Sequence, residues 1–372
     1  MPKHVVMIIA NSPNPSYFRW FAELNYSQKA CRLSFIFLYT EMPQLADEVK
    51  QYGVNSHFLF FDTYKSKPFQ YLKMFFSLYL LFRKLNPNCI QTNLFDDSLP
   101  ALLAARLAGV KKRIITKQDT GFHINYKPAM VKFDRFNNFN ATDLIAVSQE
   151  SKEIIVKNER GNSHKITLIH HGVDEKFITS AGEEDIQQIK NKFNPTGKIL
   201  IGTIARYIPS KGYTGLIHAA ALVIKKHPEC CFIGFGHGTQ QEELQKLINE
   251  LGLEKHFLLA GLVDYSLIPA VYKNLSIYVH PARLEPFGFV IAEAMFNKIP
   301  IVTTRVGASR DVLVHGQSAY LVNYDMPEEI AAGIEYILEN DISGMTNNAF
   351  VLAQNHFSRE NMWNRYKELF LS

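Results

Sequence analysis

The chain has 372 residues, of which 47% are hydrophobic and 20% are charged. That length is comfortable for two domains, and the composition excludes a disordered, collagen-like or disulfide-rich protein. The 40 lysines and arginines exceed the 35 aspartates and glutamates by five. These cations are scattered and accompany no helix-turn-helix, zinc-finger or RNA-binding motif, so nucleic acid is not an expected partner.

The amino terminus predicts a buried strand rather than a secretion signal. Residues 5–10 are all apolar and follow Met1-Pro2-Lys3-His4 directly, and this run is too short for a signal peptide. The four cysteines show neither zinc-ligand spacing nor a disulfide framework. We therefore expect a cytoplasmic protein.

Short β-rich segments alternate with helical patterns through the first half of the chain. This alternation is typical of a doubly wound parallel sheet, because each strand needs a crossover to return to the same edge. One helical pattern covers residues 99–107. The expected strands cover residues 4–10, 33–39, 57–61, 89–93, 113–117 and 143–147.

Residues 69–85 are the one segment of the chain that suggests a membrane. The uncharged part, residues 74–82, is well short of the roughly 20 residues that a spanning helix needs. Two interpretations stay open. The segment is a crossover helix buried against the sheet, which its place before the strand at 89–93 favours, or its aromatic face docks on a membrane surface.

A polar stretch, residues 179–196, separates this alternation from a second one that begins near Lys198. We place the boundary at about residue 180, which gives a first domain of residues 1–180 and a second of residues 181–355. A last helical pattern, residues 359–371, lies in the tail 356–372.

Two cations follow the first strand of the second domain. Residues 199–205 read as a buried strand, with Arg206 directly after it and Lys211 five positions later. Open α/β sheets bind ligands at the carboxyl ends of their strands. A guanidinium and an ammonium there suit a diphosphate whose negative charge grows as it leaves. The alternative is a pair of solvated loop cations.

The next strand ends in a glycine pair, Gly234-Phe235-Gly236. Such a turn lets a nucleotide approach the backbone closely. A dinucleotide-binding fingerprint would also need a third glycine and an acidic residue about 20 positions later, and this segment offers neither. The pair is therefore weak evidence by itself.

Two carboxylates, Glu285 and Glu293, bracket the run Glu-Pro-Phe-Gly-Phe-Val-Ile-Ala-Glu. A β-rich stretch at 275–281 precedes this run, a helical pattern covers 289–297 and another strand is expected at 301–304. Gly288 lets the backbone pass close to a ligand, and the amide groups at the start of the helix point into the same place. Phosphate and hydroxyl groups would both find partners there.

This run resembles the E-x7-E motif of retaining glycosyltransferases of family 4, also called glycosyl transferases group 1. The segments Gly307-Ala308-Ser309-Arg310-Asp311-Val312 and 315–322 resemble the next two blocks of that family, and the Arg206 and Lys211-Gly212 pair resembles an upstream block. The resemblance covers most of the second domain and patches of the first.

The resemblance implies the GT-B architecture, in which two Rossmann-like doubly wound parallel-sheet domains face each other across a ligand-binding cleft. It also implies that the tail 356–372 crosses back to the first domain. Glu285 matches the residue that reaches hydroxyls of the donor sugar, and Glu293 matches the one that holds the ribose. No metal or other cofactor is expected. The implied donor-binding residues are Arg206, Lys211, Gly234, Gly236, Glu285, Phe287, Gly288, Phe289, Val290 and Glu293.

The first domain should hold the acceptor, and there the chain departs from the family. Prolines replace the usual glycine-rich turn after the first strand, so we assign Asn14 and Tyr17 to acceptor contact. Gln118 takes the place of a histidine that follows the strand 113–117 in similar enzymes. Gln118 can still hold a sugar hydroxyl but cannot move a proton. Asp119 and His123 are the nearby groups that can, and we add them to Glu285, Arg206 and Lys211 as catalytic candidates.

The sequence therefore predicts a retaining, metal-independent glycosyltransferase that moves a sugar from a nucleotide diphosphate-sugar to a hydroxyl of a glycan or lipid-linked acceptor. Surface polysaccharide or lipopolysaccharide synthesis is the expected setting, in the cytoplasm or at the inner face of the membrane. Two alternatives stay open: a sugar-nucleotide epimerase or phosphorylase of the same fold, and a non-catalytic sugar-nucleotide-binding partner.

Overall fold

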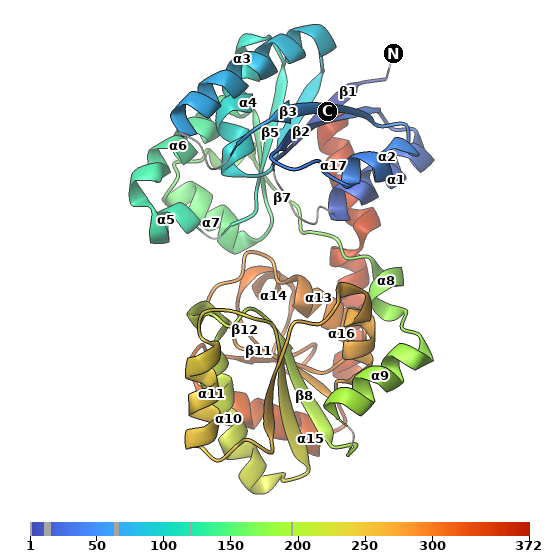
Figure 1. Cartoon of the computed structure of the whole chain (residues 1–372), viewed down its shortest axis with the longest axis vertical. Coiled ribbons are helices and arrows are strands. Elements are labelled where there is room, and N and C mark those ends of the chain that lie inside the picture. Colours follow the sequence, from blue (N-terminus) through green and yellow to red (C-terminus); the bar gives the residue numbers. More distant parts are fainter. Residues whose placement is uncertain (1, 11–15, 63–66, 120, 195) are drawn as a thin grey trace. The chain divides into compact units, whose positions relative to one another are not determined.

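The computed structural model describes residues 2–10, 16–62, 67–119, 121–194 and 196–372 (Figure 1). The chain forms two compact units. Unit 1 comprises Met1–Gly172 and Arg359–Ser372, and unit 2 comprises Val173–Ser358.

The first boundary therefore lies before residue 180, because the next helix packs in unit 2. In α8 (Glu175–Thr179) the ring of Phe177 stacks on Tyr265, with centroids 4.9 Å apart. The amide of Asn297 donates to the carbonyl of Ile178 at 3.1 Å. These contacts assign residues 173–180 to the second unit, and the return to unit 1 falls after Ser358 rather than after residue 355.

Unit 1 contains a seven-stranded parallel sheet with the order β3-β2-β1-β4-β5-β6-β7. The six strands expected from the sequence are present, and a short seventh strand follows them. Because β1 pairs with both β2 and β4, the direction of winding reverses between β1 and β4. The strands are β1 (His4–Ala10), β2 (Arg32–Tyr39), β3 (Asn55–Phe60), β4 (Cys89–Thr92), β5 (Lys112–Lys117), β6 (Asp143–Ala146) and β7 (Ile166–Leu168).

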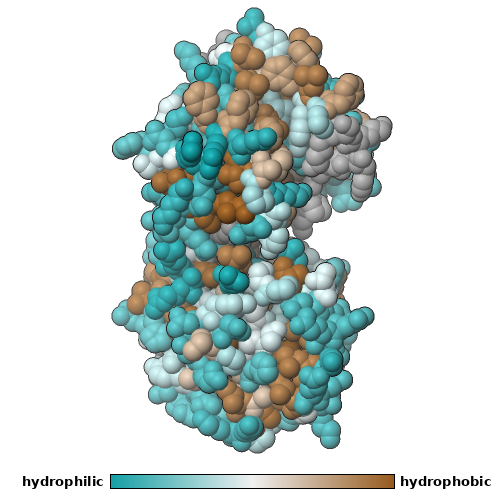
Figure 2. Space-filling view, turned by 90° about the vertical axis from the view of Figure 1, so that its left-hand side faces the viewer, coloured by the Kyte–Doolittle hydropathy of each residue, from teal (hydrophilic) through white to brown (hydrophobic). Residues whose placement is uncertain are grey.

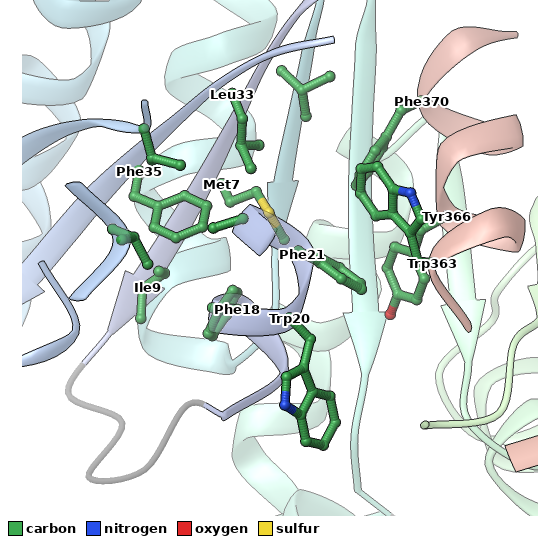
Figure 3. Packing of buried hydrophobic residues seen from close by; sticks show 14 of the residues in the cluster. Met7, Ile9, Phe18, Trp20, Phe21, Leu33, Phe35, Trp363, Tyr366 and Phe370 are labelled. Atoms are coloured by element: carbon green, nitrogen blue, oxygen red, sulfur yellow. The ribbon is translucent and has the colours of Figure 1, made fainter. Parts of the chain in front are cut away.

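Helices cover both faces of this sheet. On one face, Phe18 and Phe21 of α1 pack with Trp363, Tyr366 and Phe370 of α17 (Figure 3). On the other, Met74, Leu78 and Phe82 of α3 pack with alanines of α4. The helices of unit 1 are α1 (Ser16–Gln28), α2 (Leu45–Lys50), α3 (Lys67–Leu85), α4 (Phe95–Leu107), α5 (Phe122–Tyr126), α6 (Val131–Asn140), α7 (Gln149–Lys157) and α17 (Arg359–Leu371).

The last helix, α17, is part of the core of unit 1, although it is far from the rest of the unit in sequence. Trp363 is fully buried and donates from its indole nitrogen to Gln28 at 3.0 Å. The hydroxyl of Tyr366 lies 3.1 Å from that of Thr116 in β5. Burying three large aromatic side chains holds the tail on this unit.

Unit 2 contains a six-stranded parallel sheet with the order β10-β9-β8-β11-β12-β13. The direction of winding reverses between β8 and β11. The connections that follow these two strands therefore lead to opposite faces of the sheet. Residues of α10, α11 and α15 pack on one face in a single core cluster. The strands are β8 (Ile199–Ile204), β9 (Cys230–Phe235), β10 (Phe257–Gly261), β11 (Ile277–His280), β12 (Ile301–Thr304) and β13 (Tyr320–Val322).

The remaining helices of unit 2 complete the double winding. With α8 they are α9 (Glu183–Phe193), α10 (Tyr213–Lys226), α11 (Gln241–Glu250), α12 (Ile268–Asn274), α13 (Phe289–Phe296), α14 (Gly307–Val312), α15 (Pro327–Glu339) and α16 (Ser343–Phe357). The predicted pair of doubly wound parallel sheets is thus confirmed.

Candidate functional site

The carboxyl edge of the sheet in unit 2 brings Lys211 and Glu285 together. Lys211 follows β8 and Glu285 follows β11, the two strands at which the winding reverses. The ammonium of Lys211 lies 2.6 Å from one carboxylate oxygen of Glu285, and Nε2 of His280 lies 3.1 Å from the same oxygen. A carboxylate, a cation and an imidazole therefore meet at the point where open α/β sheets bind ligands.

Two glycines, one after β8 and one after β12, let the backbone pass close to these loops. Gly212 has φ +73°, and a Cβ there would lie 2.1 Å from the carbonyl oxygen of Pro281. Gly307, with φ +50°, opens α14, and its Cβ would lie 2.5 Å from the carbonyl oxygen of Glu285. The amide of Ala308 donates to the carbonyl of Phe287 at 2.9 Å. The backbone around Glu285 is thus held from both sides.

The carboxyl of Glu285 is kept ionised. Burial acts to raise its pKa, but the hydrogen bond and charge of His280 and the charge of Lys211 together lower the pKa to about 2. An ionised carboxylate in a partly buried site is a strong acceptor for sugar hydroxyls.

The carboxyl of Glu293 has the opposite character. Burial raises its pKa to about 7, and a hydrogen bond from the hydroxyl of Tyr272, 2.7 Å long, only partly offsets this effect. Glu293 lies on the first turns of α13, five residues after Gly288, the left-handed residue that starts the helix. Ligand hydroxyls that donate to this carboxyl would favour its ionised form.

The other expected donor-site residues fall into two groups. Arg206 and Phe289 are exposed beside the same loops. Phe287 is buried, with its ring 5.3 Å from that of Phe357, and the carbonyl of Val290 accepts from Tyr272 at 3.2 Å. The side chain of Phe287 therefore packs into the core of unit 2. Only the backbone of Phe287 is then available to contact a ligand.

The glycine pair after β9 has a role within the protein itself. A Cβ on Gly234 would lie 2.7 Å from the ring of Tyr213, and a Cβ on Gly236 would lie 2.0 Å from the carbonyl oxygen of Ala205. The sequence predicts that both glycines lie close to a bound nucleotide. The structure gives them a second reason, which is the close packing of this turn against the segment that carries Arg206.

Unit 1 gathers a polar cluster at the carboxyl edge of its own sheet. The hydroxyl of Tyr17 donates to Asn93, which follows β4, and accepts from the amide of Gln118, which follows β5, at 3.1 Å. Two of the three residues expected to contact the acceptor, Tyr17 and Gln118, are therefore in contact with each other. The third, Asn14, lies outside the described residues.

Behind Gln118 lies a buried chain of charged groups. Nδ1 of His123 is 2.7 Å from a carboxylate oxygen of Asp134, whose other oxygen is 3.5 Å from the ammonium of Lys117. Lys117 also pairs with Glu159 at 2.8 Å. Burial acts to lower the pKa of Lys117, but Glu159 and Asp134 raise it above the ordinary value. In the tautomer that donates from Nδ1 to Asp134, Nε2 of His123 is left as an acceptor.

Asp119 has a local structural role. One of its carboxylate oxygens accepts from the amides of Gly121 and Phe122, at 2.7 and 3.0 Å, where α5 begins. This is an Asx turn just before the helix. Of the two proton-moving candidates in unit 1, His123 is therefore the better placed.

Among the residues of these clusters that sequence reasoning missed are His280, Tyr272, Asn93 and Asp134. His280 and Asn93 do carry a signal, because each lies at or just after the carboxyl end of a buried strand. Tyr272 and Asp134 lie inside helices and carry none.

Among the described residues, no group of three or more histidine, cysteine, aspartate or glutamate side chains could hold a metal ion. In the same part of the chain, no helix is long and apolar enough to cross a membrane.

Two family models match the chain. Residues 31–177 match the model described as Glycosyltransferase Family 4, and residues 185–351 match Glycosyl transferases group 1. The capsular polysaccharide biosynthesis glycosyltransferase CapM of Staphylococcus aureus is 23% identical over 311 residues, which is 81% of each chain. The UDP-Gal:alpha-D-GlcNAc-diphosphoundecaprenol alpha-1,3-galactosyltransferase of Escherichia coli is 24% identical over 309 residues, 81% of this chain and 79% of that protein.

Solved structures share the fold over the whole chain. Anabaena Alr3699/HepE in complex with UDP and glucose has a TM-score of 0.80 at 19% identity and covers 100% of both chains. A glycosyltransferase from Rickettsia africae ESF-5 has a TM-score of 0.79 at 18% identity and covers 99% of this chain and 98% of that one. The GT-B fold class expected from the sequence is confirmed.

Proposed function

Because the chain belongs to the glycosyltransferases described as family 4 and group 1, we propose that it transfers a sugar from a uridine diphosphate-sugar to an acceptor hydroxyl, with retention of configuration and without a metal. The observation that carries this proposal is the meeting of Lys211, His280 and Glu285 at the switch point of unit 2. Titles of similar structures name UDP, UDP with glucose, and UDP-glucose, which supports the choice of nucleotide.

Lys211 and Arg206 neutralise the diphosphate as the bond to the sugar breaks. Lys211 already faces Glu285 at 2.6 Å, so a phosphate beside Glu285 finds its counter-charge in place, without a metal ion. Preorganised charge of this kind stabilises the growing negative charge of the leaving group. Arg206, exposed at the end of β8, supplies a second cation with a fork suited to phosphate.

Glu285 holds hydroxyls of the donor sugar, and Glu293 holds the ribose. His280 fixes the orientation of Glu285 from one side while its own Nδ1 lies 3.3 Å from the hydroxyl of Tyr278. Buried Tyr272 fixes Glu293 in the same way. Both carboxylates are therefore already in position when the donor binds.

In unit 1, the acceptor hydroxyl is bound by the cluster of Tyr17, Asn93 and Gln118. His123, supported by Asp134, contacts the acceptor through Nε2, and the departing diphosphate takes the proton of the reacting hydroxyl on the same face of the sugar. The names of two relatives, one in capsular polysaccharide synthesis and one acting on a diphosphoundecaprenol-linked sugar, support a glycan or lipid-linked acceptor in surface polysaccharide synthesis. The four free cysteines suit the reducing cytoplasm.

The test is transfer from a panel of nucleotide sugars to a lipid-diphosphate-linked sugar, with chelator present, followed by NMR of the product. We expect one UDP-sugar to give an α-linked product from its α-linked donor. A β-linked product would contradict retention, and activity that appears only with added metal would contradict metal independence.

Two controls separate the alternatives. Omitting the acceptor should leave the donor unchanged, whereas an epimerase would convert it. The variant Lys211→Ala should keep its fold. Its turnover should fall by a factor of about 10² to 10³, as when one charge-stabilising donor is removed. A full-length, folded protein that binds UDP but transfers nothing to any acceptor would instead indicate a non-catalytic binding partner.

A further inference from the structure

The outward face of α3 is apolar and cationic. Phe69, Leu72, Phe76 and Leu80 are between 55% and 67% exposed. Their spacing of three, four and four residues places them on one side of the helix. Lys73, Arg83 and Lys84 are exposed on this same face, and the 19 residues of α3 include no aspartate or glutamate. We call these seven residues the α3 face.

The opposite side of α3 is already occupied. Met74, Leu78 and Phe82 are at most 2% exposed and belong to the core between α3, α4 and the sheet of unit 1. The helix thus carries large apolar side chains on both sides, one side buried and the other at the surface. The sequence-based interpretation of a packed crossover helix is confirmed. Docking of its exposed aromatic face on a membrane stays a prediction.

A crossover helix does not need such an outer face. In unit 2, the crossover helix α10 connects β8 to β9, and its exposed residues are Thr214, His218, Lys225 and Lys226. Four large apolar side chains in a row at the surface are costly in water unless something covers them.

The net charges of the two units indicate which kind of partner would fit the α3 face. Unit 1 has 25 lysines and arginines against 15 aspartates and glutamates, a net charge of +10, whereas unit 2 has 15 against 20, a net charge of −5. The space-filling view shows hydrophobic side chains at the surface of unit 1 among hydrophilic ones (Figure 2). The α3 face therefore lies on the positively charged unit.

We propose that the α3 face docks the protein on an anionic lipid bilayer. Phe69, Leu72, Phe76 and Leu80 enter the boundary between headgroups and acyl chains, and Lys73, Arg83 and Lys84 pair with the anionic headgroups. The buried side of α3 stays on the sheet, so the helix lies flat on the membrane and brings unit 1 to it. The acceptor cluster of Tyr17, Asn93 and Gln118 belongs to this same unit.

A second copy of the chain fits this face less well. Pairing two α3 faces would bring their cations together without a carboxylate to neutralise them, and like charges in contact oppose association. An anionic membrane supplies both the apolar layer and the opposite charge.

The test is sedimentation of the full chain with vesicles of phosphatidylcholine, with and without phosphatidylglycerol. We expect binding to the anionic vesicles that weakens in high salt. Phe76→Ser with Leu80→Ser should reduce partitioning by about tenfold or more, and Lys73→Ala with Lys84→Ala by a similar factor. The matched control replaces two exposed apolar residues elsewhere, Phe139→Ser and Val351→Ser, and should bind as the wild type does.

Binding that is equal in wild type and in both α3 variants would overturn the proposal, as would no binding to the anionic vesicles. Light scattering of the same proteins tests the other occupant. A dimer that dissociates in the Phe76→Ser, Leu80→Ser variant, with no vesicle binding, would assign the face to self-association instead. None of these measurements depends on the reaction, so failure here leaves the proposed transfer untouched.

Discussion

Glu285 and Glu293 lie at the two ends of one turn, yet their surroundings give them opposite proton affinities. Glu285 has a cation and an imidazole on one oxygen, and its pKa is about 2. Glu293 has a neutral phenol beside it, and burial raises its pKa to about 7. The first is therefore a fixed charge, and the second can exchange a proton when a ligand binds.

The proton of Glu293 predicts a pH-dependent affinity for UDP. Ribose hydroxyls that donate to the carboxylate favour its ionised form, so binding lowers its pKa and releases protons near pH 7. Affinity should rise with pH up to the free-state pKa of about 7, by up to about tenfold per pH unit. Calorimetric titration in buffers of different ionisation enthalpy measures the released protons.

Glu293→Gln is the matched control, because it keeps the shape and removes the titration. Its UDP affinity should be lower and should vary less with pH in this range than that of the wild type. A wild-type protein that releases no proton on binding UDP would show that Glu293 does not contact the ribose.

At the residue scale, the sequence was most informative where a side chain follows a strand. Glu285, Lys211 and Gln118 were predicted because motif and strand end coincide. His280 also ends a strand, but it was missed because the last residue of a buried strand looks like a core residue as well. Asp134 became visible only when α6 placed it 2.7 Å from His123.

At the scale of elements, Gly307 connects α14 to the loop that carries Glu285. Its Cβ would meet two backbone oxygens, of Glu285 at 2.5 Å and of Phe287 at 2.7 Å. Backbone atoms cannot move aside as a flexible side chain can. The position therefore requires glycine for space as well as for its left-handed φ.

Gly307→Ala should lower the free energy of unfolding by roughly 2 to 4 kcal/mol and weaken donor binding, because the Glu285 loop must shift. Gly316→Ala is the control, since Gly316 has φ +74° but open space around it, and should cost about 1 kcal/mol from strain alone. Urea unfolding of the full chains compares the two. Equal losses in both variants would mean that the contact between α14 and the loop is unimportant.

Most element bounds followed from periodicity, and the exceptions have local causes. The strand at 301–304 and the helix at 359–371 have the expected bounds. Helix α4 begins at Phe95 rather than at residue 99, because the carboxylate of Asp97 accepts the amides of Asn93 and Leu94 and extends the first turn. The three-residue strand β7 is too short for a periodic signal.

At the scale of the whole molecule, two crossings of the chain divide it into its units. Val173 bridges to Ser358, and its amide donates to the carbonyl of Phe357 at 2.7 Å. The chain thus enters and leaves unit 2 at one place. Composition alone put the first crossing in the polar stretch near residue 180, because a bridge between residues so far apart in sequence leaves no local pattern.

The two units also differ in charge and in the chemistry of their sheet edges. Unit 2 is net negative and holds the carboxylates and cations suited to a nucleotide sugar, whereas unit 1 is net positive and holds neutral hydrogen-bonding groups suited to hydroxyls. This division supports one substrate for each unit.

The central claim is that the carboxyl edge of unit 2 holds the donor, with Glu293 on the ribose and Glu285 on the reacting sugar. The most direct measurement is UDP affinity by calorimetry together with initial transfer rates for Glu285→Gln and Glu293→Gln. Glu293→Gln should weaken UDP and donor alike, because ribose contacts persist through the reaction. Glu285→Gln should leave UDP affinity nearly unchanged and lower turnover, because its partner develops positive charge only as the bond breaks. Equal loss of UDP affinity in the two variants would contradict this account.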